Sequence, residues 1–364
     1  MELFGQRHTK RELLRRFANP SAACGIRLVE AADGPERGVR MLLLRTGGGI
    51  ELSILVDRCM DIGEFSFRGT PLGWQFPTGF RAPWLTDLES EDGLGLHRAF
   101  SGFWLTCGFD HMRRAARDSA AHFHSTMREE MFHPLHGRGA LTPATLRGYG
   151  ADWVADELML WAEGEMRQVF MFGENLCVRR RIQAMAGSAT LTVTDMVTND
   201  GFVSTPHMLR YHINAGWPLL DEGSRVHVAA AETVHPQPPL PANILPGPGP
   251  ANRQRVLCHR ARADTTGFSR AALSNDRLGL MLVIEYDARV LPWLQEWRSL
   301  GEGVYALGLE PLTNRMGSRA DLDAAGEILR LEPGASVTYT TRIKVIEGAE
   351  AMRAEAAIIA GGGA

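Results

Sequence analysis

The sequence predicts a mainly β protein, a large antiparallel β-sandwich with a few short helices. Short runs of branched and aromatic apolar residues are divided by turn residues such as glycine, proline and asparagine. Polar and apolar positions alternate through much of residues 158–199, as in antiparallel strands with one face in water. We therefore expect a meander of strands here, over residues 158–164, 169–172, 176–184 and 189–199.

The same pattern predicts strands on both sides of this meander, at residues 39–45, 50–56, 278–287, 303–309 and 336–347. Thr9 and Glu12 form a capping-box pattern that predicts a helix to about Asn19 and Pro20. An alanine-rich stretch after Glu347 predicts a final helix. We expect a single domain over residues 1–364, with residues 1–20 as an N-terminal helical extension and residues 232–255 as a proline-rich surface loop.

The composition is that of a globular protein and argues against several classes of partner. Hydrophobic residues make up 45% and charged residues 22% of the 364 residues, so a sizeable core can form. The net charge is -3 and no basic stripe with interleaved aromatic residues occurs, which argues against nucleic acid as the main ligand. The five cysteines lie far apart without a Cys-x-x-Cys motif, which favours reduced thiols in the cytoplasm. Since neither a signal sequence nor a membrane-length apolar run is visible, we expect a cytoplasmic protein that does not associate with membranes.

Three segments carry polar residues at the ends of strand-like runs. The first is the loop at residues 132–139, where Pro134 separates His133 from His136 and prevents a shared helical turn. The second and third deliver His212 and Glu310. Each of these residues alone is more often structural than catalytic. Together, histidines and a carboxylate at strand ends are the groups needed to move protons on and off hydroxyl oxygens near neutral pH.

These three segments resemble the aldose 1-epimerases, or galactose mutarotases. Leu135-His136-Gly137 is similar to the family's Leu-His-Gly loop, and Leu309-Glu310-Pro311 stands near the C-terminus. The segment Tyr211-His212-Ile213-Asn214 is similar to its Asn-His-x-Tyr-Phe-Asn strand, although Tyr211 replaces an asparagine and Ile213 a polar residue. A divergent bacterial branch of the superfamily is matched more closely, through residues 57–63, 106–111, 211–214, 216 and 218–220.

The resemblance implies a supersandwich of galactose mutarotase type and an isomerase of carbohydrate metabolism. It implies that Glu310 is the base and His212 the acid that open and close the ring of a hemiacetal, and that His136 orients the sugar between them. Other hydroxyls of the sugar would be held by substrate-binding residues from several segments, namely Arg58, Asp110, His111, Arg138, Asn214 and Trp217. His133 is interpreted as structural. No cofactor is required, and the sequence contains no glycine-rich phosphate loop.

Two other functions stay open at this stage. Residues 111–136 contain five histidines, His111, His122, His124, His133 and His136, which suit a metal-assisted isomerase or lyase acting on a keto sugar. Their spacing matches no standard zinc motif. A non-catalytic carbohydrate-binding protein on the same fold is the third hypothesis. The identity and charge of the sugar are left open, as is assembly into a homodimer.

Overall fold

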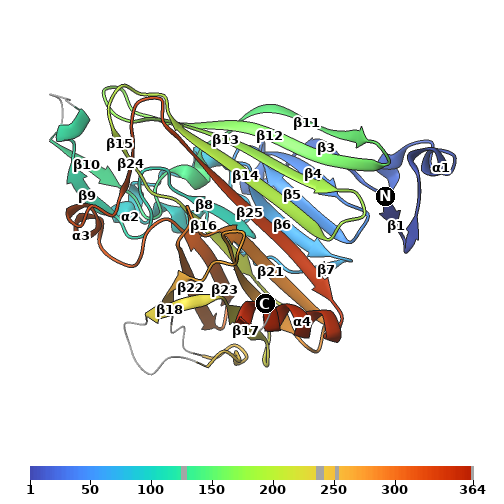
Figure 1. The fold of residues 1–364 in the computed structure, drawn as a ribbon. Helices are drawn as coiled ribbons and strands as arrows, with labels where there is room; N and C mark the ends of the chain where they lie inside the picture. The colour runs from blue at the N-terminus through green and yellow to red at the C-terminus, as the bar shows by residue number, and fades with distance from the viewer. Residues whose placement is uncertain (124–128, 235–241, 251–253, 362–364) are drawn as a thin grey trace.

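Two large antiparallel sheets pack across a shared hydrophobic core in the computed structural model, which describes residues 1–123, 129–234, 242–250 and 254–361 (Figure 1). The first sheet has eight strands, in the order β11 (Thr145–Val154), β12 (Glu157–Val169), β13 (Asn175–Met185), β14 (Thr190–Asn199), β25 (Ser336–Glu347), β21 (Leu280–Asp287), β20 (Phe268–Asn275) and β17 (Arg225–Val228). The second sheet has eleven, in the order β18 (Ala230–Val234), β19 (Arg255–Ala261), β22 (Trp293–Gly301), β23 (Val304–Leu312), β16 (Arg210–Ala215), β8 (Trp104–Cys107), β6 (Asp61–Phe67), β5 (Ile50–Leu55), β4 (Arg40–Arg45) and β3 (Gly25–Glu30), with β7 (Thr70–Pro71) beside β6.

Smaller elements lie around the two large sheets, at their ends or against their outer faces (Figure 1). Three two-stranded sheets pair β1 (Glu2–Leu3) with β2 (Gln6–Arg7), β9 (Ala116–Ser119) with β10 (Glu130–His133), and β15 (Thr205–His207) with β24 (Leu329–Leu331). The α-helices are α1 (Lys10–Leu14), α2 (Ser90–Gly93), α3 (Arg319–Ala324) and α4 (Ala349–Ala360). Short 3-10 helices are η1 (Pro20–Ala22), η2 (Gly34–Glu36), η3 (Pro83–Leu85), η4 (Gly95–Arg98), η5 (Ala121–Phe123) and η6 (Gly139–Leu141). None of the helices in the described ranges has both the length and the apolar character to cross a bilayer.

The alternation in the sequence becomes the two faces of the first sheet. In β14, Leu191, Val193 and Val197 are buried in the core, while the threonines between them lie on the more exposed face. The strands β16 and β23 of the second sheet differ, because all residues of β16 and nearly all of β23 are buried. One face of these two strands packs into the core, and the other carries polar side chains under the loops that cover it.

The sandwich and most of its expected strands are confirmed, with two local differences. The helix at Thr9 begins with the expected capping box but ends at Leu14, and residues 15–18 separate it from Asn19, which takes an extended backbone before Pro20. Residues 1–20 also include the hairpin of β1 and β2, so this segment is only partly helical. The separate strand at residues 169–172 is wrong: β12 continues to Val169, since residues 166–169 still pair with β13.

Two further predictions concern the final helix and the proline-rich surface loop, and the structure describes only part of the loop. The final helix after Glu347 is confirmed as α4. The surface loop expected over residues 232–255 is shorter than predicted, because residues 232–234 end β18 and Arg255 begins β19. Residues 235–241 and 251–253 are outside the described ranges. Its described part, residues 242–250, contains only isolated bridges.

A buried ionic network joins the two sheets. Arg180 of β13 forms ion pairs with Asp195 of β14 at 2.6 Å and with Asp61 of β6 at 2.9 Å, and it donates to the Thr106 hydroxyl at 2.8 Å. The Tyr211 hydroxyl donates to Asp195 at 2.6 Å. Burial raises the pKa of Asp61 to about 6, although Arg180 and Thr106 act to lower it. The network therefore fastens β16 to the first sheet directly behind the polar face that β16 presents on its other side.

Candidate active site

Cross-strand register brings together the two distant residues that are predicted to transfer protons. Ile213 of β16 lies opposite Leu309 of β23, so the preceding residue His212 faces the following residue Glu310 across the ladder. On its other side Glu310 pairs with Gln295 of β22. Three adjacent strands thus place His212, Glu310 and Gln295 in one row on one face of the second sheet.

The Glu310 carboxylate is fully buried and is surrounded by three polar side chains. His212 Nε2 lies 3.1 Å from Glu310 Oε1. Gln295 Nε2 donates to Glu310 Oε2 at 2.9 Å, and Arg210 Nη1 lies 3.0 Å from the same oxygen. Arg210 precedes His212 by two residues in β16, and the period of a strand therefore puts both on one face. Gln295 and Arg210 thus hold Oε2, while Oε1 faces the imidazole and accepts no hydrogen bond from the described residues.

Asn214 determines which nitrogen of His212 can exchange protons. The Asn214 amide nitrogen donates to the Gly102 carbonyl at 3.0 Å, so its Oδ1 atom faces His212 Nδ1 at 2.6 Å. An amide oxygen can only accept, and His212 Nδ1 must therefore carry a hydrogen. This leaves Nε2, the nitrogen beside Glu310, as the atom that gains and loses a proton.

The buried environment raises the pKa of Glu310 and lowers the pKa of His212. Burial raises the pKa of Glu310 to about 7, against the lowering effect of Arg210 and Arg113. Burial and the positive charge of Arg210 lower the pKa of His212 well below its usual range. Near neutral pH the pair therefore shares one proton, which is the property expected of groups that act as acid and base in turn.

Gly308 provides the space in which this pair fits. A Cβ atom on Gly308 would lie 2.6 Å from Glu310 Oε1 and 3.1 Å from His212 Cε1. Any other residue at this position of β23 would therefore push the carboxylate or the imidazole out of place.

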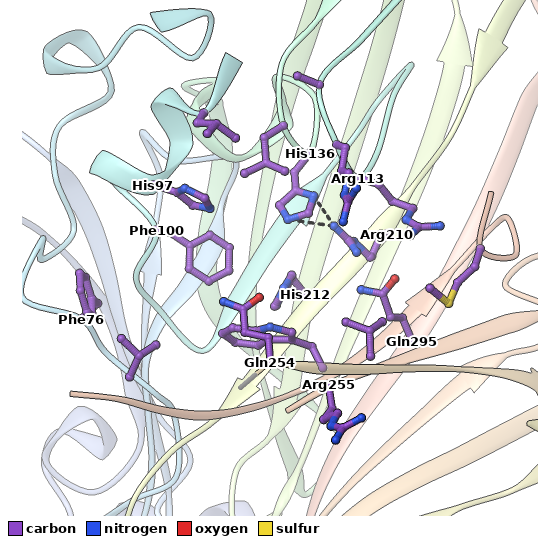
Figure 2. A pocket seen from close by; sticks show the side chains of 18 of the residues that line it. Phe76, His97, Phe100, Arg113, His136, Arg210, His212, Gln254, Arg255 and Gln295 are labelled. Atoms are coloured by element: carbon purple, nitrogen blue, oxygen red, sulfur yellow. Dashed lines mark hydrogen bonds between the residues drawn. The ribbon is translucent and has the colours of Figure 1, made fainter. Parts of the chain in front are cut away.

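A cavity of about 850 Å³ opens above this row (Figure 2). His212, Arg210 and Gln295 line its floor, whereas Glu310 lies behind them and does not line it. Four aromatic side chains also line it: Trp74, Phe76, Phe100 and Trp297. The ring of Phe100 meets the ring of His212 edge-on, with centroids 4.9 Å apart. The volume lies within the range typical of small-molecule sites.

His136 reaches the cavity from the loop after β10. Its backbone amide donates to the Arg113 carbonyl at 2.6 Å, and its carbonyl accepts from the Gly108 amide at 3.0 Å. The ring contacts the Arg210 guanidinium, as the dashed lines in Figure 2 show, and its centroid is 5.7 Å from that of His212. The structure therefore brings the three predicted catalytic residues, His136, His212 and Glu310, to one site.

Three of the predicted substrate-binding residues are buried and are not among the residues that line this cavity. Arg58 donates to the Ala99 carbonyl at 2.6 Å, and burial lowers its pKa to about 10. Asp110 lies 3.1 Å from His133 Nδ1; although burial acts to raise the pKa of Asp110, its hydrogen bond with His133 lowers it. The ring of His111 stacks on His133 with centroids 5.0 Å apart, and burial lowers its pKa to about 3. Charged residues at a strand end look alike in sequence whether they turn toward solvent or into the interior.

The other three predicted substrate-binding residues also lie outside the lining. Arg138 pairs with Glu89 at 2.5 Å and donates to the Phe132 carbonyl at 2.8 Å. Trp217 is 65% exposed on the surface after β16. Asn214 is fully buried and acts on the site only through His212.

The histidine-rich segment is dispersed in the structure. His111 and His133 stack together, while His122 packs on Phe123 with ring centroids 4.0 Å apart. His124 lies outside the described residues. Among the residues that are described, no group of three histidine, cysteine, aspartate or glutamate side chains is placed to hold a metal ion.

Sequence reasoning did not single out Arg210, Gln295 or Arg113. Arg210 could have been found from its position two residues before His212, since a strand repeats every two residues. Gln295 is a polar residue within an apolar strand-like run, a weaker signal. Arg113 lies in a loop, and no feature of its neighbourhood in the sequence indicates the cavity.

Comparisons with known proteins agree with this architecture. A family model described as "Domain of unknown function (DUF4432)" matches residues 36–345. No curated protein matches the chain. A structure of a candidate aldose 1-epimerase from Klebsiella pneumoniae subsp. pneumoniae is similar with a TM-score of 0.83 at 21% identity, covering 93% of this chain and 88% of that chain.

Two further solved structures are similar at lower scores. A galactose mutarotase-like protein from Clostridium acetobutylicum has a TM-score of 0.60 at 13% identity, covering 88% of this chain and 98% of that one. A galactose 1-epimerase from Lactobacillus acidophilus has a TM-score of 0.54 at 13% identity, covering 89% and 99%. At such identities the likeness establishes the fold. The chain therefore has the galactose mutarotase-like fold, and because the family model covers most of its length, it belongs to the DUF4432 family.

Proposed function

We propose that this protein is an isomerase that interconverts the anomers of a sugar by opening and closing its ring. The contact between His212 Nε2 and Glu310 Oε1 at the floor of a sugar-sized cavity is the observation that carries this proposal. Solved structures of the same fold include proteins named as aldose epimerases.

Ring opening of a hemiacetal needs one proton removed and one added. A base takes the proton of the anomeric hydroxyl while an acid protonates the ring oxygen, and the bond from that oxygen to the anomeric carbon breaks. In our proposal Glu310 is the base and His212 the acid. After rotation about the bond between the anomeric carbon and its neighbour, the two groups exchange roles and the ring closes on the other face. Ring opening and ring closure need the same two proton transfers with the roles exchanged. A pair that shares one proton near neutral pH suits such a reaction.

The surroundings of the pair suit a sugar ring. Phe100 and Trp297 line the cavity and offer apolar surface to the C–H face of a ring. His136 and Arg210 supply hydrogen-bond donors beside it. Because Glu310 lies behind His212 and Gln295, the substrate must displace one of these side chains to reach the carboxylate. Such tightening on binding is common for catalytic contacts.

Replacement of Glu310 by Gln tests the proposal. The amide keeps the size of the side chain and a hydrogen-bond acceptor for Arg210, but it cannot accept a proton. We expect anomer interconversion to fall by about 10²-fold or more, while sugar binding stays measurable. Exchange NMR on a panel of aldoses, deoxy sugars, sugar acids and keto sugars would measure the rate, with thermal unfolding as the control for folding.

Two results would argue against this function. Activity of Glu310→Gln equal to that of the parent would remove the carboxylate from the mechanism. Binding of sugars without accelerated exchange of any of them would favour the non-catalytic carbohydrate-binding alternative.

A further inference from the structure

We propose that the substrate is a sugar bearing an anionic group, a carboxylate, sulfonate or phosphate, which the cavity holds with arginines. The inference rests on the function proposed above and specifies its class of substrate. Its basis is the charge and placement of the side chains that line the cavity.

The cavity is positive although the protein is negative. Its basic lining residues are four arginines, Arg113, Arg114, Arg210 and Arg255. Among the described lining residues only Asp92 is acidic, and Glu310 behind the floor adds one more carboxylate. The whole chain, in contrast, has 42 acidic and 39 basic residues. Burial lowers the pKa of the lining histidines, so they are neutral at pH 7 and add no charge to this balance: His97, His136 and His212.

Arg210 forms an ion pair with Glu310, whereas Arg113 forms no ion pair or hydrogen bond with His212 or Glu310 among the described residues. Among the described residues, the Arg113 guanidinium forms one hydrogen bond, a long one of 3.4 Å to the Gly317 carbonyl. Burial lowers its pKa, and so does the charge of Arg210, which lies near it (Figure 2). Two guanidinium groups crowded together in a partly buried wall repel each other, and an anion between them would remove that cost.

The backbone of Arg113 is strained in this position. Its φ of +82° lies in the left-handed region that arginine rarely adopts. The carbonyl of Arg113 accepts the His136 amide, so the segment that carries Arg113 also fixes the catalytic loop. Strain of this kind is typical of residues held for binding or catalysis.

Arg114 extends the positive wall toward the mouth of the cavity. Its side chain is exposed and forms no ion pair with any described residue within 4.0 Å. Its carbonyl accepts from His111 Nε2 at 2.7 Å, which anchors the backbone while the guanidinium stays available. Arg255 lies on the opposite side of the cavity, beyond Gln254 (Figure 2).

This placement orients a charged sugar. An anionic group next to Glu310 would be repelled, whereas Arg113 and Arg114 lie on the loop that forms the wall. The anomeric centre would then face His212 and Glu310, and the charged end would face the loop. The guanidinium fork matches the paired oxygens of carboxylate, sulfonate and phosphate, and such charge-assisted bonds are stronger than those to a neutral hydroxyl.

Matched sugars that differ only at carbon 6 test the inference. Glucose and galactose would be compared with their uronates, their 6-phosphates and 6-sulfonated glucose, by exchange NMR and by calorimetric titration. We expect at least one charged form to bind and exchange with about tenfold higher kcat/KM than its neutral parent. That preference should weaken with added salt, because screening reduces the attraction. The charged group that binds best identifies which anion the site takes.

Arg114→Gln should reduce the preference for the charged sugar by about tenfold. Arg117→Gln is the matched control: Arg117 lies three residues on, is exposed, and pairs with Glu130 at 3.8 Å rather than lining the cavity. It should leave the preference unchanged. An equal loss in both variants would show that overall charge, not the cavity, is responsible, and would overturn the inference.

The two proposals fail in different ways. Neutral sugars that bind and exchange as well as the charged ones would overturn the anionic substrate while leaving the mutarotase intact. Preferential binding of a charged sugar, lost in Arg114→Gln but without anomer exchange, would support the anion site and refute the isomerase. Failure of every charged sugar to bind more tightly than its neutral parent would overturn the inference.

Discussion

The protonation state of Glu310 should control how activity depends on pH. Burial raises its pKa to about 7, and only the ionised carboxylate can take the proton of the anomeric hydroxyl. The reactive form keeps one proton on the pair, held by His212 Nε2 while Glu310 is ionised, and this proton is lost as the pH rises through the pKa of Glu310. We therefore expect kcat/KM to be level below this pKa and to fall about tenfold per pH unit above it. His212, whose pKa is lowered well below its usual range by burial, should add no second inflection between pH 6 and pH 8.

Exchange NMR across this pH range would measure the profile, after subtraction of the uncatalysed rate at each pH. A kcat/KM that stays constant between pH 6 and pH 8 would contradict Glu310 as the base. A kcat/KM that rises through this range would mean that the pair acts without its shared proton and that His212 is not the acid.

The loop that carries His136 depends on a single glycine. Gly137 has a φ of +73°, and a Cβ atom there would lie 2.4 Å from the His111 carbonyl and 2.5 Å from the Gly108 carbonyl. We expect Gly137→Ala to displace His136, lowering kcat/KM by about 10²-fold, since a shift of about 1 Å in a catalytic group has effects of that order. Stability should fall by more than about 1–2 kcal/mol, because crowding adds to the backbone strain.

Gly34→Ala separates the two causes of that loss. Gly34 also has a positive φ, +61°, but nothing lies within 4 Å of its Cβ position. It should lose only about 1–2 kcal/mol from strain and keep full activity. Thermal unfolding and exchange NMR on both variants would measure this, and equal losses would show that crowding at Gly137 has no effect on the loop.

At the scale of the whole molecule, Arg180 holds the two sheets in register behind the site. Arg180→Met would leave Asp61 and Asp195 buried without their cation, and we expect a loss of about 3–5 kcal/mol in the free energy of unfolding. The neighbouring Arg179→Met is the matched control, because its side chain is 57% exposed and lies 3.5 Å from Glu165. It should cost about 0–1 kcal/mol.

Urea unfolding followed by tryptophan fluorescence would compare the two variants. Similar losses for Arg179→Met and Arg180→Met would mean that the buried network contributes no more than a surface ion pair. The activity of Arg180→Met measured well below its unfolding midpoint would then show how far the site depends on this support.

Local periodicity made much of the fold predictable. The alternation of apolar residues such as Leu191, Val193 and Val197 with polar ones is a property of consecutive residues. It predicted the strand β14, which the structure confirms. The end of β12 was harder to place, because residues 166–169 continue a strand only through their pairing with β13. The family's motifs indicated His136, His212 and Glu310, and the structure brings these three to one site.

The sequence by itself determined the sandwich class, because it follows from residue types and short-range spacing, and it indicated the polar residues at strand ends that we propose transfer protons. Only the tertiary structure decided which polar side chains surround them. Arg210 and Gln295 meet Glu310 through the pairing of β16, β23 and β22. The register of β16 with β23 joins residues about a hundred positions apart, and local sequence carries no direct record of it. Local sequence also carries no direct record of burial. Arg58 and Asp110 are buried in the interior, whereas Arg113 and Arg114 line the cavity wall.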